Sequence, residues 1–508
     1  MDREKKISIN KFHKIVLILG SIFILLSVFH TSIWFDESYS VKIAENSFVD
    51  IWKIGSHDVH PIFYYWILHI IYLIFGKNIL AYRLFSALCM ILVGVIGYTH
   101  IRKDFGERSG VYFSILSFFL PFSATYASEI RMYTLGFLIG TIFSIYAYRI
   151  YNNKEYNLKD FIIFGISSIL LCYTHYYGLV FAGVLNFILL IYFIVKHNLK
   201  KKELITFIII AAVQIILYLP WLMIFLGQLN SVSHGFWISL SFPTTLFEIV
   251  STQFKGNLDL VFSFIISTII LIYLIYRLVV MIIEKRKISD DKKSNEFDYR
   301  PALFSFILYI LIVLIVYLIS IIMKPILLYR YLLIISSLLI FSIAYVLGKD
   351  ESRIRVFIVI SLVLIISGIN MNSLIKENYD ISNVEAKSYI ENNIKDGDIV
   401  LYRNAINGAV ITTELSMTKN NISYFYDKDH WNVDEAYKTF GDTLIIKQEL
   451  KDILDSYKGK IYIVESGNSH ELYDEVNDNY NITLIEKNDF YQKYKDYTYS
   501  IYLIEKNN

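Results

Sequence analysis

Two adjacent carboxylic acids, Asp36 and Glu37, follow the first long apolar stretch of the chain. An ionisable pair at the mouth of a membrane span is costly to place there, so a functional role is the default hypothesis. A carboxylate can accept a proton from a hydroxyl nucleophile, which makes the pair a candidate for general-base catalysis. The alternative is that the two acids only mark the point where the chain reaches water.

Further polar side chains interrupt the apolar sequence in later loops. They are His57, Asp58, His60, Arg83, Glu129, Arg131, Tyr133, His175, Lys324 and Arg330. Arginine and lysine can bind and stabilise a phosphate leaving group, and tyrosine rings can stack on sugars or line a lipid groove. Together with a carboxylate base, these residue types suit transfer from a lipid-phosphate donor at the membrane surface.

Some of these residues also have a purely structural interpretation. Arg83 could extend its charge from the end of a span to the membrane interface. Arg131 could form an ion pair with Glu129, and His175 could be a satisfied polar residue between two spans. The residue types alone therefore leave the function of each side chain open.

The composition indicates a membrane protein. The 508 residues are 55% hydrophobic and 16% aromatic, and the mean hydropathy is +0.47. Apolar runs of about 18 or more residues are typical of membrane-spanning helices. The net charge of +2 gives no indication of nucleic-acid binding. Cys89 and Cys172 lie in apolar runs without a Cys-x-x-Cys pair, so neither a disulfide framework nor a thiolate metal site is expected.

Eleven apolar segments are predicted to cross the membrane, and the first is expected to be retained rather than cleaved as a signal peptide. They are residues 15–33, 80–100, 109–127, 132–150, 160–175, 177–195, 203–222, 259–283, 302–322, 329–347 and 354–371. With the N-terminus in the cytoplasm, the inner loops hold 25 Lys and Arg and the outer loops hold 7. The positive-inside rule favours this orientation, which places all the candidate residues on the outer side.

The last part of the chain, residues 371–508, differs in charge and in pattern. It holds 15 Lys and Arg against 24 Asp and Glu, which suits an acidic, water-soluble tail. Short strand and helix patterns alternate along it, as in a small α/β domain. The predicted strands are 398–403, 422–427, 460–465, 483–486 and 499–505, and the predicted helices are 382–392, 446–457 and 471–479.

The sequence therefore predicts a polytopic α-helical membrane domain at residues 1–370 and an extracytoplasmic α/β domain at residues 371–508. In the long loop 31–79, residues 40–46 and 61–75 are rich in apolar and aromatic side chains. Short helices lying in the membrane interface are expected there, because aromatic rings prefer that depth.

Four segments in this order resemble glycosyltransferase family 39, a GT-C superfamily group that includes protein O-mannosyltransferases and lipid A aminoarabinose transferases. They are Trp34–Ser40 (WFDESYS), Asp58–Tyr65 (DVHPIFYY), Arg83–Ser86 (RLFS) and Glu129–Tyr133 (EIRMY). Thr174–Gly178 and Arg330–Leu332 are similar to segments of bacterial and archaeal members. Ile62 departs from the pattern, because many relatives have a second proline there; this alters the turn and leaves the chemistry unchanged.

The resemblance implies a GT-C fold, a polyprenyl-phosphate sugar donor, transfer on the outer face and inversion at the anomeric carbon. Asp36 maps onto the catalytic acid of the family, and Glu37 is expected to orient Asp36 or to bind the acceptor. Arg83, Arg131 and Arg330 map onto residues near the donor phosphate, and Lys324 is a looser assignment. The remaining candidates for substrate contact are Asp58, His60, Glu129, Tyr133 and His175.

The predicted protein is thus an inverting glycosyltransferase of the plasma membrane that moves a monosaccharide, with a mannose-like hexose favoured. The acceptor could be a protein, a lipid or a glycan. Polyprenyl phosphate is already a competent leaving group, so no cofactor is required. A divalent metal is not predicted, although His57, Asp58 and His60 have metal-ligand side chains. Two alternatives stay open: a polytopic lipid or polysaccharide transporter, and a lipid-linked glycan polymerase or ligase.

Overall fold

The computed structural model describes residues 2–152, 155–196, 200–233, 240–287, 298–323, 325–402, 410–411, 413–414, 422–426, 443–445, 447–456, 460–466 and 470–506. Contacts group the chain into two compact units, residues 1–29 with 83–374 and residues 30–82 with 375–508. The long first loop is therefore grouped with the tail. The domain boundary at residue 370, drawn where apolar spans give way to the acidic tail, stays a prediction.

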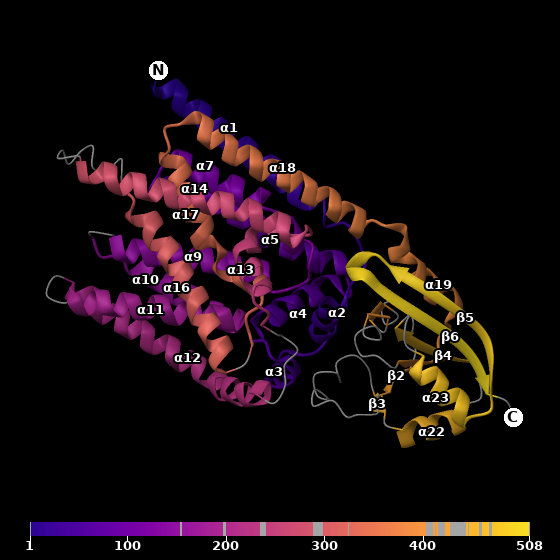
Figure 1. Cartoon of the computed structure of the whole chain (residues 1–508). Helices are drawn as coiled ribbons and strands as arrows, with labels where there is room; N and C mark the ends of the chain where they lie inside the picture. The colour runs from indigo at the N-terminus through magenta and orange to yellow at the C-terminus, as the bar shows by residue number, and fades with distance from the viewer. Residues whose placement is uncertain are drawn as a thin grey trace. The chain divides into compact units, whose positions relative to one another are not determined.

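The first unit is helical, because in lipid a helix satisfies its own backbone hydrogen bonds. Its elements are α1 (Asp2–Leu25), α5 (Ile79–Ile96), the π-helical η1 (Gly97–Ile101), α6 (Arg102–Phe105), α7 (Glu107–Phe119), α8 (Pro121–Ala127), α9 (Tyr133–Asn152), α10 (Leu158–Thr174), α11 (Tyr176–Val195), α12 (Lys201–Ser233), α13 (Thr244–Lys255), α14 (Leu260–Lys287), α16 (Arg300–Ile322), the 3₁₀-helical η2 (Tyr329–Ile335), α17 (Ser336–Lys349) and α18 (Arg353–Asn378). Figure 1 shows these helices in the indigo-to-orange part of the chain.

The predicted spans coincide with helices, although α1 lies earlier than predicted and ends at Leu25. Within the described ranges, nine helices are long and apolar enough to cross a membrane. The pair α7–α8 makes a tenth span bent by 56°. Pro121 opens α8 and explains the break, because proline cannot donate the backbone hydrogen bond that would continue α7. The predicted span 160–175 forms α10, whose 17 residues are close to the lower limit of about 17 for crossing a bilayer.

Small residues set the close packing around α17, the most buried span of this unit. Gly348 on α17 lies against Ser109 on α7 and leaves no room there for a Cβ atom. Such small residues let helix backbones approach closely in a membrane. A second contact joins α1, α7 and α18 through Val16, Val111 and Ile360, and these three helices can be followed in Figure 1.

The second unit begins with the first loop, which forms α2 (Phe35–Ala44), α3 (Phe48–Ser56) and α4 (Phe63–Phe75). Ser47 caps α3 by accepting a hydrogen bond from the N–H of Asp50. The C-terminal half of α4 exposes large apolar side chains: Ile70, Leu73, Ile74 and Phe75. An apolar helix of 13 residues is too short to span a bilayer and suits a position at the membrane surface.

The tail forms a mixed six-stranded sheet with the order β3-β2-β1-β4-β6-β5. Its elements are η3 (Ile381–Val384), α19 (Glu385–Asn393), β1 (Ile399–Tyr402), β2 (Ile422–Tyr426), β3 (Thr443–Ile445), α22 (Lys447–Ser456), β4 (Lys460–Ser466), α23 (Glu471–Asn479), β5 (Ile482–Gln492), η5 (Tyr494–Asp496) and β6 (Tyr497–Lys506). The strands β1 to β4 pair in parallel, whereas β6 is antiparallel to both β4 and β5.

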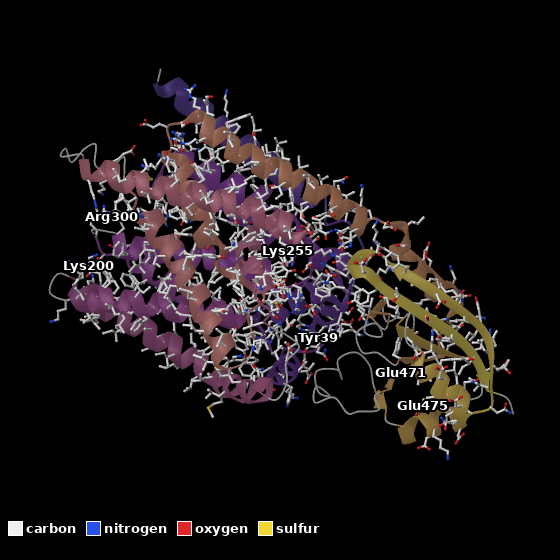
Figure 2. All side chains as sticks on the ribbon, viewed as in Figure 1. Tyr39, Lys200, Lys255, Arg300, Glu471 and Glu475 are labelled. Atoms are coloured by element: carbon white, nitrogen blue, oxygen red, sulfur yellow. The ribbon has the colours of Figure 1, made fainter. Side chains whose placement is uncertain are left out.

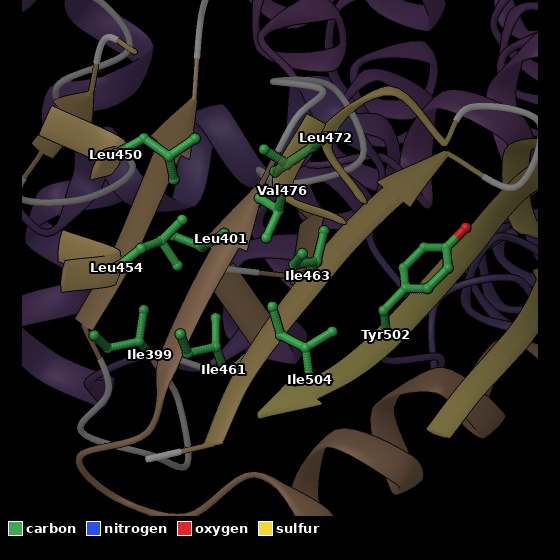
Figure 3. Packing of buried hydrophobic residues seen from close by; sticks show 10 residues of the cluster. All are labelled: Ile399, Leu401, Leu450, Leu454, Ile461, Ile463, Leu472, Val476, Tyr502 and Ile504. Carbon is green, nitrogen blue, oxygen red and sulfur yellow. The ribbon is translucent and has the colours of Figure 1, made fainter. Parts of the chain in front are cut away.

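The predicted α/β character of the tail is confirmed, and its core explains the sheet. Apolar side chains from β1, β4 and β6 pack against Leu450 and Leu454 of α22 and against Leu472 and Val476 of α23 (Figure 3). Burial of these side chains is the main stabilising contribution to such a layer. The sequence did not predict β3, and it predicted only the first part of β5.

Candidate active site

The two acids of the first loop lie in the first turn of α2. The N-terminus of a helix carries a partial positive charge and backbone N–H groups without helical partners, so it stabilises carboxylates. The side chain of Asp36 is partly exposed, whereas that of Glu37 is fully buried. The backbone of this turn is reinforced by Ser40, whose hydroxyl donates to the carbonyl oxygen of Asp36 at 2.9 Å. Asp36 is therefore the more exposed of the two acids.

Glu37 is bound by the tail. The phenol of Tyr494 donates a hydrogen bond to Glu37 Oε2 at 3.0 Å, and both side chains are buried. Two adjacent acids therefore have different surroundings, which sequence reasoning could not assign. Tyr494 is 457 residues from Glu37 along the chain.

The histidine-rich segment of the first loop lies between α3 and α4. His57 is exposed, and its Nδ1 lies 3.0 Å from the carbonyl oxygen of Lys53. His60 is buried, and its Nδ1 lies 2.9 Å from the carbonyl oxygen of Val59. Asp58 is partly buried. Among the residues that the structure describes, no three His, Cys, Asp or Glu side chains gather as metal ligands would.

In the first unit, the predicted residues Tyr133 and His175 belong to one aromatic cluster. The ring of Tyr331 lies 4.7 Å from that of His175 and 6.0 Å from that of Tyr133, between ring centroids. His175 caps α11, and its Nδ1 accepts a hydrogen bond from the N–H of Tyr177 at 3.1 Å. A neutral His175 consequently carries its proton on Nε2.

Two predicted arginines border this cluster. The guanidinium carbon of Arg131 lies 5.9 Å from the ring centroid of Tyr133, and that of Arg330 lies 5.8 Å from the ring centroid of Tyr331. Arg131 is buried together with Glu129, whereas Arg330 is partly exposed. Guanidinium groups within about 6 Å of a ring face are attracted to it. The structure therefore brings Arg131, Tyr133, His175 and Arg330 together.

Arg83 is a further cation of the first unit. Its side chain is fully buried on α5, one of the largest completely buried side chains in the described part of the chain. Its burial does not favour a side chain that extends into water at the membrane interface. A buried charge of this kind must be compensated by polar or charged groups. Lys324 lies outside the described residues.

Lys255 was not singled out in the sequence. Lys255, which is labelled in Figure 2, ends α13. Its Nζ lies 3.8 Å from the ring centroid of Tyr329, the residue before Arg330. Lys255 Nζ also lies 3.4 Å from Oε1 of Glu248 on the same helix. Buried Gln253 fixes the helix by donating to Ser336 Oγ at 3.0 Å. The sequence did contain a feature that could have identified Lys255, because it is the single Lys or Arg of the long loop 223–258.

The backbone of α9 determines where Arg330 and Tyr331 lie. A Cβ atom at Gly140 would lie 2.6 Å from the carbonyl oxygen of Ile334, and one at Gly136 would lie 2.9 Å from the Ile334 side chain. These two glycines, one turn apart, let η2 pack directly on α9. The element that carries Arg330 and Tyr331 thus packs on a helix, and sites supported by helices are more precise than sites on loops.

This group of residues can bind an anion attached to an apolar or sugar-containing molecule. Three cations, Lys255, Arg131 and Arg330, supply charge and hydrogen-bond donors. The adjoining rings offer faces for stacking. The first unit therefore carries candidate binding groups, and the second unit carries the candidate base Asp36.

Residues 59–224 match the family model described as dolichyl-phosphate-mannose-protein mannosyltransferase. The structure is similar to ArnT from Cupriavidus metallidurans bound to undecaprenyl phosphate, with 12% sequence identity and a TM-score of 0.64 over 97% of this chain and 98% of that one. The apo state of the same protein gives 10% identity and a TM-score of 0.52 over 99% and 98%. No curated protein sequence matches this chain.

Proposed function

We propose that this chain is a membrane glycosyltransferase of the GT-C superfamily and that it transfers one sugar from a polyprenyl-phosphate donor to a hydroxyl acceptor on the outer face of the membrane. The observation that carries the proposal is a set of three cation–ring contacts: Arg131 with Tyr133, Lys255 with Tyr329 and Arg330 with Tyr331. Cations next to aromatic rings suit a phosphate that joins a sugar to a lipid.

The donor class has further support. Undecaprenyl phosphate is bound in the ArnT structure that shares this fold, and the matched family model is described by a dolichyl-phosphate-mannose donor. Both molecules are polyprenyl phosphates. The family description favours a mannose-like hexose as the transferred sugar. The acceptor is a protein, a lipid or a glycan that presents a hydroxyl group.

The reaction is a single displacement. Asp36 accepts the proton of the acceptor hydroxyl as its oxygen attacks the anomeric carbon. A bond forms between that oxygen and the anomeric carbon, and the bond from the anomeric carbon to the phosphate oxygen breaks. The lipid phosphate leaves with the bonding electrons, and the cations stabilise its added charge. Attack from the face opposite the leaving group inverts the anomeric centre.

Replacement of Asp36 tests the proposal. The purified protein is supplied with a radiolabelled polyprenyl-phosphate mannose and a membrane extract as the source of acceptor. We expect Asp36→Asn to express and insert normally and to lose about 10²–10⁴-fold in transfer rate, as is typical when a general base is removed. Transfer by Asp36→Asn at the rate of the unmodified protein would refute the mechanism.

The same assay separates the alternatives by their products. A glycosyltransferase of this class adds one sugar to each acceptor site. A polymerase or ligase would transfer a longer glycan from a lipid-linked oligomer and would leave the monosaccharide donor unused. A transporter would move the lipid across a vesicle membrane without breaking the bond between sugar and phosphate.

A further inference from the structure

The turn between β5 and β6, here called the β5–β6 tip (residues 492–497), contacts the first loop at three points. Gln492 Nε2 donates to the carbonyl oxygen of Ile33 at 3.1 Å. The N–H of Phe35 donates to Tyr497 Oη at 3.3 Å. The phenol of Tyr494 donates to Glu37 Oε2 at 3.0 Å. These contacts fall on alternate residues of the loop and lie on both sides of Asp36.

Burial shows that these contacts are part of a packed structure. Gln492, Tyr494 and Glu37 are each at most 3% exposed. Burying a carboxylate is costly unless hydrogen-bond donors satisfy it. The phenol of Tyr494 supplies such a donor to Glu37 from the tail. The loop adds two ring contacts to the tip: the His30 ring lies 4.8 Å from that of Tyr494, and Lys495 Nζ lies 5.4 Å from the centroid of the Trp34 ring.

The backbone of the β5–β6 tip is held in a strained conformation. Lys495 and Asp496 have φ angles of 63° and 53°, in the left-handed region that disfavours residues other than glycine. Surrounding groups fix the turn: Tyr494 N–H donates to Asn383 Oδ1 at 2.8 Å, and Lys495 N–H donates to Glu377 Oε1 at 3.2 Å. Strain that neighbouring structure maintains is concentrated at functional sites.

Electrostatics also link the β5–β6 tip to Asp36. Burial raises the pKa of Tyr497 to about 12; the Phe35 N–H opposes the rise, and the negative charge of Asp36 adds to it. Tyr497 therefore keeps its proton at neutral pH. A neutral phenol next to the loop binds the Phe35 backbone without adding a charge beside Asp36.

We infer that the β5–β6 tip is a positioning element for the catalytic turn, with Tyr494 and Glu37 as its anchoring pair. The inference deepens the proposed function and rests on Asp36 being the base. Glu37 then acts through the loop backbone and does not contact the reacting atoms. The tail contributes to the chemical step by fixing Asp36, because small displacements of a catalytic group cost large factors in rate.

Amide hydrogen exchange of the full-length protein in lipid nanodiscs tests the contact without any need for activity. Tyr494→Phe removes one hydroxyl, and Glu37→Gln removes the charge that it binds. Loss of a hydrogen bond to a charged group should make exchange in the peptide 33–44 about tenfold faster in either variant. Tyr462→Phe is the matched control, because its buried phenol also donates at 3.0 Å, to the carbonyl oxygen of Asn393 within the tail. In Tyr462→Phe, the peptide 33–44 should exchange at the rate seen in the unmodified protein.

Transfer kinetics with polyprenyl-phosphate mannose test the positioning role. We expect Tyr494→Phe to lower kcat about tenfold and to leave KM for the donor unchanged, since misplacing a base affects the chemical step. Combining Tyr494→Phe with Glu37→Gln should add little further loss, because both changes break one contact. A general loss of tail stability would instead affect Tyr462→Phe equally.

Two results would overturn the inference. One is unchanged exchange in residues 33–44 of both Tyr494→Phe and Glu37→Gln. The other is faster exchange with an unchanged kcat, which would make the contact structural only. Failure of the proposed function gives a different result, because an unmodified protein that transfers no mannose would still show whether the β5–β6 tip orders the first loop.

Discussion

Lys255 and Arg330 approach the neighbouring rings of Tyr329 and Tyr331. If these cations bind the donor phosphate, Lys255→Ala should lower kcat/KM for polyprenyl-phosphate mannose by about 10- to 100-fold, the usual cost of losing a hydrogen bond to a charged group. Lys202→Ala is the control, because Lys202 Nζ lies a similar 4.0 Å from the ring centroid of Tyr156 in a loop predicted to be cytoplasmic. Equal losses in the two variants, measured by initial transfer rates, would contradict a phosphate role for Lys255.

Single residues show where sequence reasoning succeeds. The acidic pair is visible in the sequence because ionisable residues are rare beside long apolar runs. The different surroundings of Asp36 and Glu37 are not visible, because Tyr494 meets Glu37 only through the folded tail. Lys255 is similar: its single charge is visible in the sequence, but its ring partner Tyr329 is supplied by another element.

Between elements, the two glycines of α9 decide how η2 is placed. Gly140→Ala puts a methyl group 2.6 Å from the carbonyl oxygen of Ile334, so the backbone of η2 must shift. We expect at least a tenfold loss of transfer and a destabilisation of about 1–3 kcal/mol, as for other overpacking changes. Gly183→Ala on α11 is the control, because nothing lies within 4 Å of the added Cβ.

Transfer rates and thermal unfolding temperatures of the glycine variants test how strongly α9 positions η2. Gly136→Ala should fall between the two, because it meets only the flexible Ile334 side chain. A Gly140→Ala protein as active and as stable as Gly183→Ala would show that α9 does not position η2.

Helices and strands were predicted correctly from the sequence where the hydrophobic pattern alone defines them. Long apolar runs identified the helices, whereas the 3₁₀ geometry of η2 was missed because its apolar sequence is equally compatible with an α-helix. The full length of β5 was missed for another reason. Most of its side chains are exposed, and apolar and polar residues do not alternate along it, so it lacks the pattern of a half-buried strand and is defined by its pairing with β6.

For the whole molecule, the sequence identified an apolar part and an acidic tail but could not show that residues 30–82 group with that tail. Grouping by contacts depends on pairs such as Gln492 with Ile33, 459 residues apart. No periodicity within a short window reports such a pair. The second unit therefore joins the candidate base to a domain whose own stability becomes relevant to transfer.

That stability should depend on pH through Glu465. Burial raises the pKa of its carboxyl to about 7 from an ordinary 4.5, although the N–H groups of Leu472 and Tyr473 oppose the rise. The folded state thus binds the proton more tightly than the unfolded state. The stabilisation is complete below about pH 4.5, is lost as the pH rises through about 7, and is on the order of 3 kcal/mol.

Differential scanning calorimetry of the intact protein at pH 5, 6, 7 and 8 can measure this dependence. Glu465→Gln cannot titrate, so its unfolding temperature for the second unit should fall less between pH 5 and 7 than that of the unmodified protein. Glu505→Gln, an exposed glutamate on β6 of the same sheet, should behave as the unmodified protein does. Glu414 is also buried, with its pKa raised to about 7, so some pH dependence should remain in Glu465→Gln. Parallel curves for Glu465→Gln and Glu505→Gln would show that Glu465 titrates normally, and the link between pH and the stability of the unit that holds Asp36 would then have to come from other groups.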